Sequence, residues 1–107
     1  MHCDSRGILR VLWLVAVVAL VPSLSLADDA GKVLFDRKCA MCHGVDGVAK
    51  NMAAGSANLN DPEWQEANSA ESIVTVITEG KGRMKGYDGR LTEAEIKQIA
   101  DYVKTLK

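Results

Sequence analysis

Residues 39–43 read Cys39-Ala40-Met41-Cys42-His43, and this short stretch decides how the rest of the sequence is interpreted. Two thiols stand three positions apart, and an imidazole follows the second one directly. The string C-x-x-C-H is the attachment pattern of a c-type haem. Its spacing lets two cysteine sulfurs add to the two vinyl groups on one edge of a porphyrin. The histidine is then held below the ring, where its imidazole can bind the iron.

Three other kinds of site share part of this pattern. A disulfide between Cys39 and Cys42 is compatible with an exported chain. A thioredoxin-like redox pair needs a preceding strand in a βαβ context, and the sequence indicates neither. A zinc site needs further cysteine or histidine ligands, and the chain has only Cys3 and His2 besides the motif. Covalent haem is therefore the favoured interpretation, with the disulfide as its first alternative.

A haem bound by one histidine has a second axial position, and three methionines are candidates for it. Met41 lies between the two cysteines and is tied to the attachment edge, so it is not expected over the opposite face. Met52 follows in a loop rich in glycine and alanine. Met84 stands among glycines that let the backbone approach a flat ring closely. Met84 is the favoured sixth ligand, and Met52 or an open position are the alternatives.

The first 27 residues have the pattern of a secretory signal peptide. A basic start precedes the apolar run VLWLVAVVALV at residues 11–21, and small residues lead to Ala27. The run is shorter than the roughly 20 residues that a membrane-spanning helix needs. We expect cleavage after Ala27 and a single domain, residues 28–107, in the periplasm or an equivalent exported compartment. An uncleaved anchor at residues 8–26 is the alternative.

The charge and size of the chain exclude one class of function and indicate a need for a stabilising group. The chain has 13 basic and 14 acidic residues, and the leader takes Arg6, Arg10 and Asp4, which leaves 11 basic and 13 acidic residues in the mature part. This balance excludes a nucleic-acid binder, which would show a basic excess. A domain this small buries little apolar surface, so it needs disulfides, a metal or a cofactor for stability. A covalent haem would meet that need.

Helical signals dominate the mature part of the sequence. Caps mark the helix starts, with Asp61 before a proline, Ser69, and a capping box formed by Thr92 and Glu95. The last helix has the strongest signal, because apolar residues recur there at the spacing of a half-buried helix. No run alternates as a strand. The sequence therefore predicts an all-α fold with long loops and four short helices, at residues 29–38, 61–64, 70–79 and from 92 onward.

Together these features resemble the class I c-type cytochromes, the small soluble monohaem cytochromes c. The resemblance covers residues 31–106. Besides the haem motif it rests on four groups of residues. The first helix contributes Gly31, Leu34 and Phe35, and a leucine–acid–tryptophan segment consists of Leu59, Asp61 and Trp64. The methionine loop contributes Gly82 and Met84, and the closing helix contributes Leu91, Thr92, Ile96, Tyr102 and Val103. Two positions depart from the family. Lys85 follows the methionine, and Ala57 lies near the carbonyl that accepts the haem histidine's N–H, where the family often has proline.

The resemblance implies a cytochrome c-like fold of about four short helices and long loops wrapped around one covalently bound haem. It assigns thioether bonds to Cys39 and Cys42, the axial iron positions to His43 and Met84, and packing on the haem to Leu59 and Trp64. The implied protein is an electron carrier between redox protein partners, with no small-molecule substrate and no enzymatic activity. The rival function is an open haem site that binds a gas or peroxide, which requires an iron without Met84.

The methionine loop has a charge that is opposite to that of the rest of the mature chain. Its four basic residues oppose only Asp88, which gives residues 80–90 a net charge of +3 in a net acidic domain. Such a basic rim would orient the protein toward an acidic partner. The alternative is that these are ordinary solvated loop charges. The rim consists of Lys81, Arg83, Lys85 and Arg90, and a monomer is expected.

Overall fold

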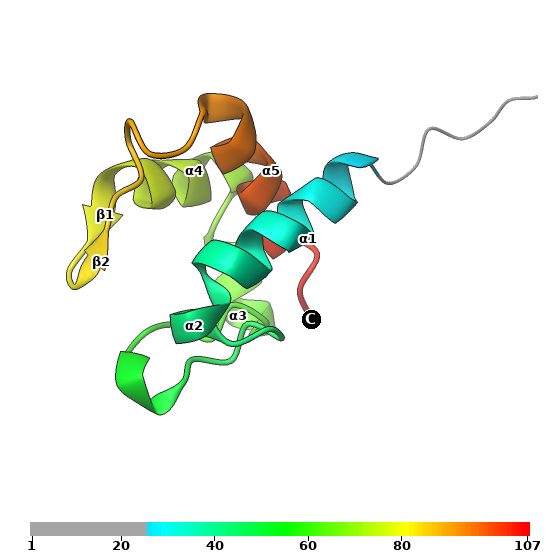
Figure 1. Ribbon diagram of the computed structural model, residues 1–107. Coiled ribbons are helices and arrows are strands. Elements are labelled where there is room, and N and C mark those ends of the chain that lie inside the picture. Colours follow the sequence, from blue (N-terminus) through cyan, green and yellow to red (C-terminus); the bar gives the residue numbers. More distant parts are fainter. Residues whose placement is uncertain (1–25) are drawn as a thin grey trace, which may run out of the picture.

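The computed structural model describes residues 26–107, with side chains from Asp29 onward. Figure 1 shows a mainly helical arrangement, and the predicted all-α class is confirmed. In chain order the elements are α1 (Leu26–Lys38), α2 (Ala40–His43), the 3-10 turn η1 (Asn51–Ala53), α3 (Pro62–Ala67), α4 (Ala70–Glu79), the strands β1 (Gly80–Lys81) and β2 (Met84–Lys85), and α5 (Glu93–Val103).

The N-terminal predictions fall almost wholly outside this range. The signal peptide at residues 1–27 and the alternative anchor at residues 8–26 overlap the described residues only at their last positions. Helix α1 begins at Leu26, three residues earlier than predicted, so the expected cleavage after Ala27 falls in its first turn. Within residues 26–107 no helix has the length and apolar character needed to cross a membrane.

The core is organised by the crossing of α1 and α5 (Figure 1). Gly31 lies so close to α5 that a Cβ added there would stand 2.3 Å from the backbone oxygen of Gln98. The fully buried ring of Phe35 packs on Tyr102, with ring centroids 5.4 Å apart. Residues of the first-helix group, Gly31 and Phe35, thus pack on Gln98 and Tyr102 of the closing helix. Glycine is required at the crossing because any side chain would push the two backbones apart.

Helices α4 and α5 begin at the predicted caps, and each buries one apolar face. The Ser69 side chain accepts a hydrogen bond from the Ser72 N–H, and Thr92 and Glu95 form the complete capping box. Each cap provides partners for N–H groups that a helix start leaves unpaired. The apolar residues behind them form most of the core, which includes Ile73, Ile77, Ile96, Ile99, Ala100 and Val103.

The segment after α4 differs from the prediction of no strands. Strands β1 and β2 form a small antiparallel hairpin in which Lys81 pairs with Met84 and Gly80 pairs with Lys85. Gly82 takes the first turn position with φ +59°, a left-handed conformation that favours glycine. Two-residue strands are too short to show an alternating pattern, so the sequence gives no strand signal here. The hairpin positions Met84 at a defined place beside the end of α4.

Candidate functional site

The predicted attachment motif lies where α1 turns into α2. The Cys39 N–H donates to the carbonyl of Phe35 at 2.8 Å, and the Cys39 carbonyl accepts from the His43 N–H at 2.9 Å. The chain thus continues as a second short helix, which the sequence analysis missed. Because Cys39 and Cys42 are three residues apart in helical backbone, their side chains share one side of the turn. This is the arrangement that two bonds to one ring edge require.

The two thiols are free but differ in environment. Cys39 is buried and Cys42 is exposed. Burial, with a smaller contribution from Cys42, raises the pKa of the Cys39 thiol to about 11, so this sulfur is protonated at neutral pH. Within residues 26–107 no three His, Cys, Asp or Glu side chains gather closely enough to hold a metal ion. The cysteines and His43 therefore do not converge on one point, as the ligands of a zinc site would.

His43 is half-buried, and its surroundings favour the neutral imidazole. Burial lowers the pKa of this side chain, and the neutral form is the one that binds metals. Its Nδ1 is buried and has no hydrogen-bond partner among the described residues. The carbonyl partner that the resemblance places near Ala57 is therefore not found. Ala57 is exposed, and an alanine lacks the ring that would fix the backbone there.

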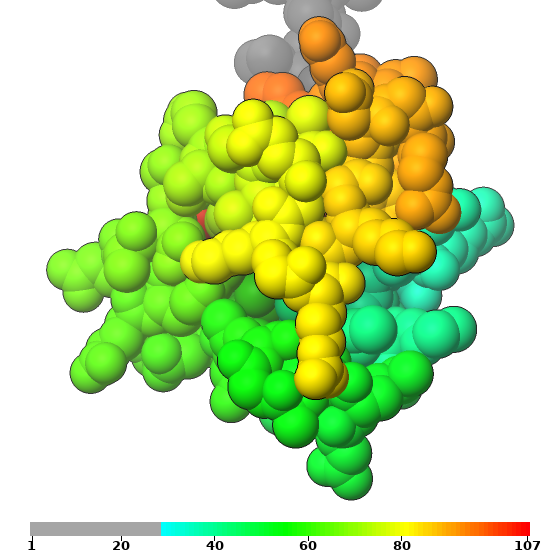
Figure 2. All heavy atoms as spheres, turned by 90° about the vertical axis from the view of Figure 1, so that its left-hand side faces the viewer, coloured from blue at the N-terminus to red at the C-terminus, as the bar shows by residue number. Residues whose placement is uncertain are grey.

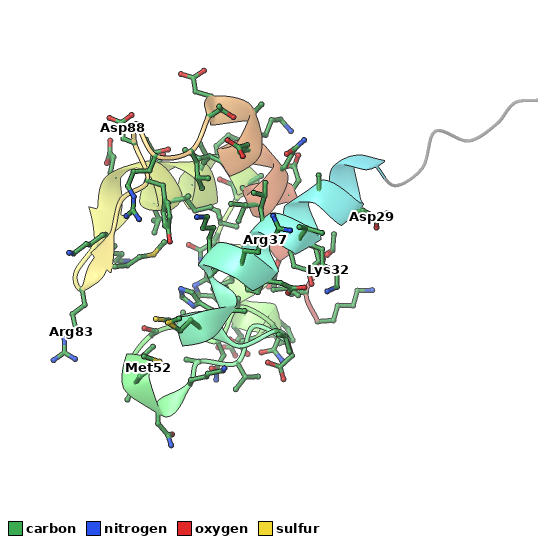
Figure 3. All side chains as sticks on the ribbon, in the orientation of Figure 1. Asp29, Lys32, Arg37, Met52, Arg83 and Asp88 are labelled. Carbon is green, nitrogen blue, oxygen red and sulfur yellow. The ribbon has the colours of Figure 1, made fainter. Side chains whose placement is uncertain are left out.

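The three candidate methionines are shielded to different degrees. Met84 is half-buried and packs against the core. Met41 is 70% exposed and Met52 is 65% exposed. Figure 3 shows Met52 on η1, in the loop below the hairpin from which Arg83 extends. Met84 is thus the one methionine of the three that the fold holds in a sheltered position.

The hairpin and the α2–η1 segment form two rims of one side of the molecule (Figure 1). Figure 2 looks onto this side, where the surface is recessed between the hairpin, in yellow, and the green residues of the loop below it. One rim carries the cysteines and His43, and the other carries Met84. Two thiols, a neutral imidazole with an unpartnered nitrogen and a sheltered thioether are a donor set that fits a c-type haem.

The two residues expected to pack on the haem lie in different settings. Leu59 is buried in the core, and its N–H donates to the Gly47 carbonyl at 2.8 Å. Trp64 is half-buried, packs on the core edge and lines an open pocket of about 420 Å³ that residues 57–64 form. None of the cysteines, His43 or Met84 lines this pocket. It is a local feature at the start of α3 and not the recess between the two rims.

A pair of polar residues that the sequence analysis missed fixes α3 against the end of α5. The Gln65 amide donates to the carbonyls of Leu59 and Val103, at 2.6 and 2.8 Å. The Lys104 ammonium donates to the carbonyls of Gln65 and Asn68, at 2.5 and 2.9 Å. These bonds hold the segment of Leu59 and Trp64 in place. No sequence signal identifies them, because their carbonyl partners lie up to 39 residues away.

Tyr87 packs against the core and also makes a polar contact. Its hydroxyl donates to the carbonyl of Lys38 at 3.0 Å. The guanidinium of Arg90 lies 4.9 Å from the centre of its ring, within the range of a cation–π contact. Burial raises the pKa of Tyr87, so the hydroxyl keeps its proton and stays a donor at neutral pH.

Comparison with known proteins gives the same family throughout. Residues 26–103 match the family described as cytochrome c oxidase, cbb3-type, subunit III. The chain is 38% identical over 92 residues to FixP, a cbb3-type cytochrome c oxidase subunit of Azorhizobium caulinodans, and the match covers 78% of this chain and 30% of FixP. The chain therefore spans less than a third of that relative's length.

Two shorter relatives match over nearly their whole length. Cytochrome c6 of Rippkaea orientalis is 35% identical over 105 residues, which is 92% of this chain and 91% of that protein. The solved structure of the KustC0563 c-type cytochrome superposes with a TM-score of 0.69 at 34% identity, covering 72% of this chain and 96% of that one. The chain thus belongs to the cytochrome c family, as a class I single-haem domain of the kind whose members carry covalent haem c.

Proposed function

We propose that the protein carries single electrons between redox proteins through one haem c. Cys39 and Cys42 would hold the haem through thioether bonds, and His43 and Met84 would bind its iron. The observation that carries this proposal is the sheltered position of Met84 on a hairpin across the recess from the attachment motif. The other two methionines of the mature chain are largely exposed.

The bound haem supplies a one-electron iron couple. His43 and Met84 would supply the same two donor atoms in both oxidation states, so that the transfer would need little rearrangement. The imidazole–thioether pair would raise the reduction potential, and an apolar lining, to which Leu59 is expected to contribute, would tune it further by excluding water. With His43 and Met84 both bound to the iron, no position would be left for a substrate. The chain therefore acts as a carrier and not as an enzyme.

The absorption spectrum of the reduced holoprotein, recorded before and after carbon monoxide is added, tests this proposal. We expect a low-spin spectrum that shows no prompt change when carbon monoxide is added, because His43 and Met84 would both have to be bound to the iron. A prompt shift to a carbon monoxide complex would instead favour the rival function, an open haem site for gas or peroxide chemistry.

A second candidate function is that of an electron-transferring subunit within a larger oxidase. The match to cbb3-type subunit III and the similarity to FixP favour it. The site and the electron transfer step are the same in both candidates, and the native size distinguishes them. A free carrier elutes at the mass of one domain, whereas a subunit elutes with its complex after mild detergent extraction.

We further propose export and cleavage after Ala27, because covalent haem attachment of this type takes place beyond the inner membrane. The intact mass of the purified protein is expected to equal residues 28–107 plus one haem. A larger mass that retains the leader would favour the anchor at residues 8–26.

The basic rim is proposed to guide partners toward the hairpin. Lys81, Arg83 and Lys85 are exposed, and neither ion pair formed within residues 29–107 involves them. Because residues paired across two strands share a face, Lys81 lies on the Met84 face and Lys85 on the other. Arg83 extends from the hairpin tip (Figure 3). The guanidinium of Arg90 lies over the Tyr87 ring, so this basic group also takes part in a contact within the protein.

An anionic oxidant can probe this rim directly. Oxidation of the reduced holoprotein by hexacyanoferrate(III) is expected to slow by at least about threefold between low and high salt, because salt screens the attraction. Arg83→Gln and Lys81→Gln should slow it at low salt, whereas Lys107→Gln at the distant C-terminus should not (Figure 1). Equal effects of all three substitutions, or a rate independent of salt, would contradict a directing rim.

A further inference from the structure

Tyr87 connects three parts of the molecule. Its N–H donates to the carbonyl of Ile77 at 2.8 Å, which fixes its backbone to the last turn of α4. Its own carbonyl accepts from the N–H groups of Arg90 and Leu91, at 2.9 and 3.0 Å. Three residues before it, Met84 begins the second hairpin strand. The backbone of Tyr87 thus anchors the C-terminal side of the methionine hairpin.

The Tyr87 side chain reaches from this anchor to the attachment motif. Its hydroxyl donates to the carbonyl of Lys38, which is 49 residues away in the sequence. Lys38 is the last residue of α1 and directly precedes Cys39. The last carbonyls of a helix have no partner within it. Tyr87 therefore provides a partner for a carbonyl at the junction of α1 and α2.

In the described part of the chain, no other hydrogen bond joins the hairpin to the attachment motif. Within residues 29–107, the Tyr87–Lys38 contact is the only hydrogen bond between the loop 80–91 and the segment 29–53 that carries the motif. The remainder of the hairpin pairs with itself and with the end of α4. The spacing between Met84 and the attachment motif therefore depends on this one polar contact and on packing.

We propose that Tyr87 is a positioning residue that holds the Met84 hairpin at the correct distance from the Cys39–His43 motif. The inference rests on the proposed function, since the distance matters only if Met84 binds the iron. The hydroxyl restrains the hairpin from swinging away, and the stacked Arg90 guanidinium holds the ring in the orientation that the bond needs. Without the hydroxyl, the hairpin opens more often and exposes the sixth position of the iron.

The experiment compares carbon monoxide binding to reduced Tyr87→Phe holoprotein with binding to two controls. Tyr102→Phe removes the same atom from a ring whose contact is with Phe35. Ile99→Val trims the core at a side chain that is 1% exposed, and so weakens the fold away from the site. We expect Tyr87→Phe to raise the rate of carbon monoxide binding about threefold, the effect of one partly exposed hydrogen bond on a local equilibrium. The controls should bind at the wild-type rate.

Each outcome separates the inference from the function on which it rests. If wild type resists carbon monoxide and Tyr87→Phe binds it no faster, Met84 ligation stands and the role of Tyr87 is refuted. If Ile99→Val accelerates binding as much as Tyr87→Phe, the hydroxyl acts only through overall stability, and the inference is again refuted. If wild type already binds as fast as Met84→Ala, the proposed ligation fails and the inference fails with it.

Discussion

Reduced holoprotein with Met84→Ala is expected to bind carbon monoxide at once, whereas wild type binds it only slowly and weakly. An alanine cannot reach the iron, so the sixth position becomes open to an added ligand. If Met84 keeps that position closed about 99% of the time, its removal strengthens apparent binding about a hundredfold. The substitution also removes a half-buried side chain from the core edge, which costs roughly 2 kcal/mol of stability. Titration with carbon monoxide, followed by absorption, measures the first effect.

The matched control for this prediction is Met52→Ala. Met52 has the same side chain and is 65% exposed on η1, so its removal should change stability by less than about 0.5 kcal/mol. The iron of this variant is expected to stay closed to carbon monoxide. If Met52→Ala opened the iron and Met84→Ala did not, the ligand would be the loop methionine that the sequence analysis kept as an alternative.

The parts of the site that sequence could predict are those whose signals lie close together in the chain. The cysteines and His43 form one contiguous motif, so the attachment edge needed no knowledge of the fold. Helices α4 and α5 were predicted from caps that bond only three residues ahead, at Ser69 and Thr92. In each case the residues that determine the local structure are neighbours in sequence, so their chemistry alone is sufficient to predict it.

The parts that sequence could not predict depend on distant backbone carbonyls. Any carbonyl of the chain is a possible acceptor for Gln65 or Tyr87, and only the fold brings Val103 and Lys38 to them. The hairpin strands are too short for a pattern, and the shelter of Met84 depends on how that hairpin packs on α4. Met84 was therefore favoured from its glycine-rich surroundings and from the resemblance, whereas its sheltered position became visible only in the fold.

The second large effect is expected at the crossing of α1 and α5. Helix propensity alone predicts that Gly31→Ala stabilises the protein by about 0.5–1 kcal/mol, because alanine is the better helix former. The crossing opposes this, since the added Cβ would stand 2.3 Å from the Gln98 oxygen and 3.0 Å from the Tyr102 Cβ. The nearest atom belongs to the backbone, so no side-chain rotation relieves the contact and the helices must separate.

We therefore expect Gly31→Ala to lower the free energy of unfolding by about 2 kcal/mol, within the usual range for overpacking. For a domain of this size that loss corresponds to a fall in Tm of roughly 8–16 °C. Gly31→Val should lose more, because its branched side chain adds two methyl groups to the same contact. Guanidinium chloride unfolding of the oxidised holoproteins, followed by far-ultraviolet circular dichroism, measures both.

A substitution on the exposed side of the same helix separates the crossing from helix propensity. Val33 is 46% exposed on α1, and Val33→Ala should change stability by less than about 0.5 kcal/mol. The sign of the Gly31→Ala effect then decides between the two influences. A stabilised Gly31→Ala protein would mean that helix propensity prevails and that α1 and α5 do not approach closely at this point. A destabilised one would mean that the contact between the two backbones requires glycine, and that the scaffold carrying both the attachment motif and the closing helix depends on it.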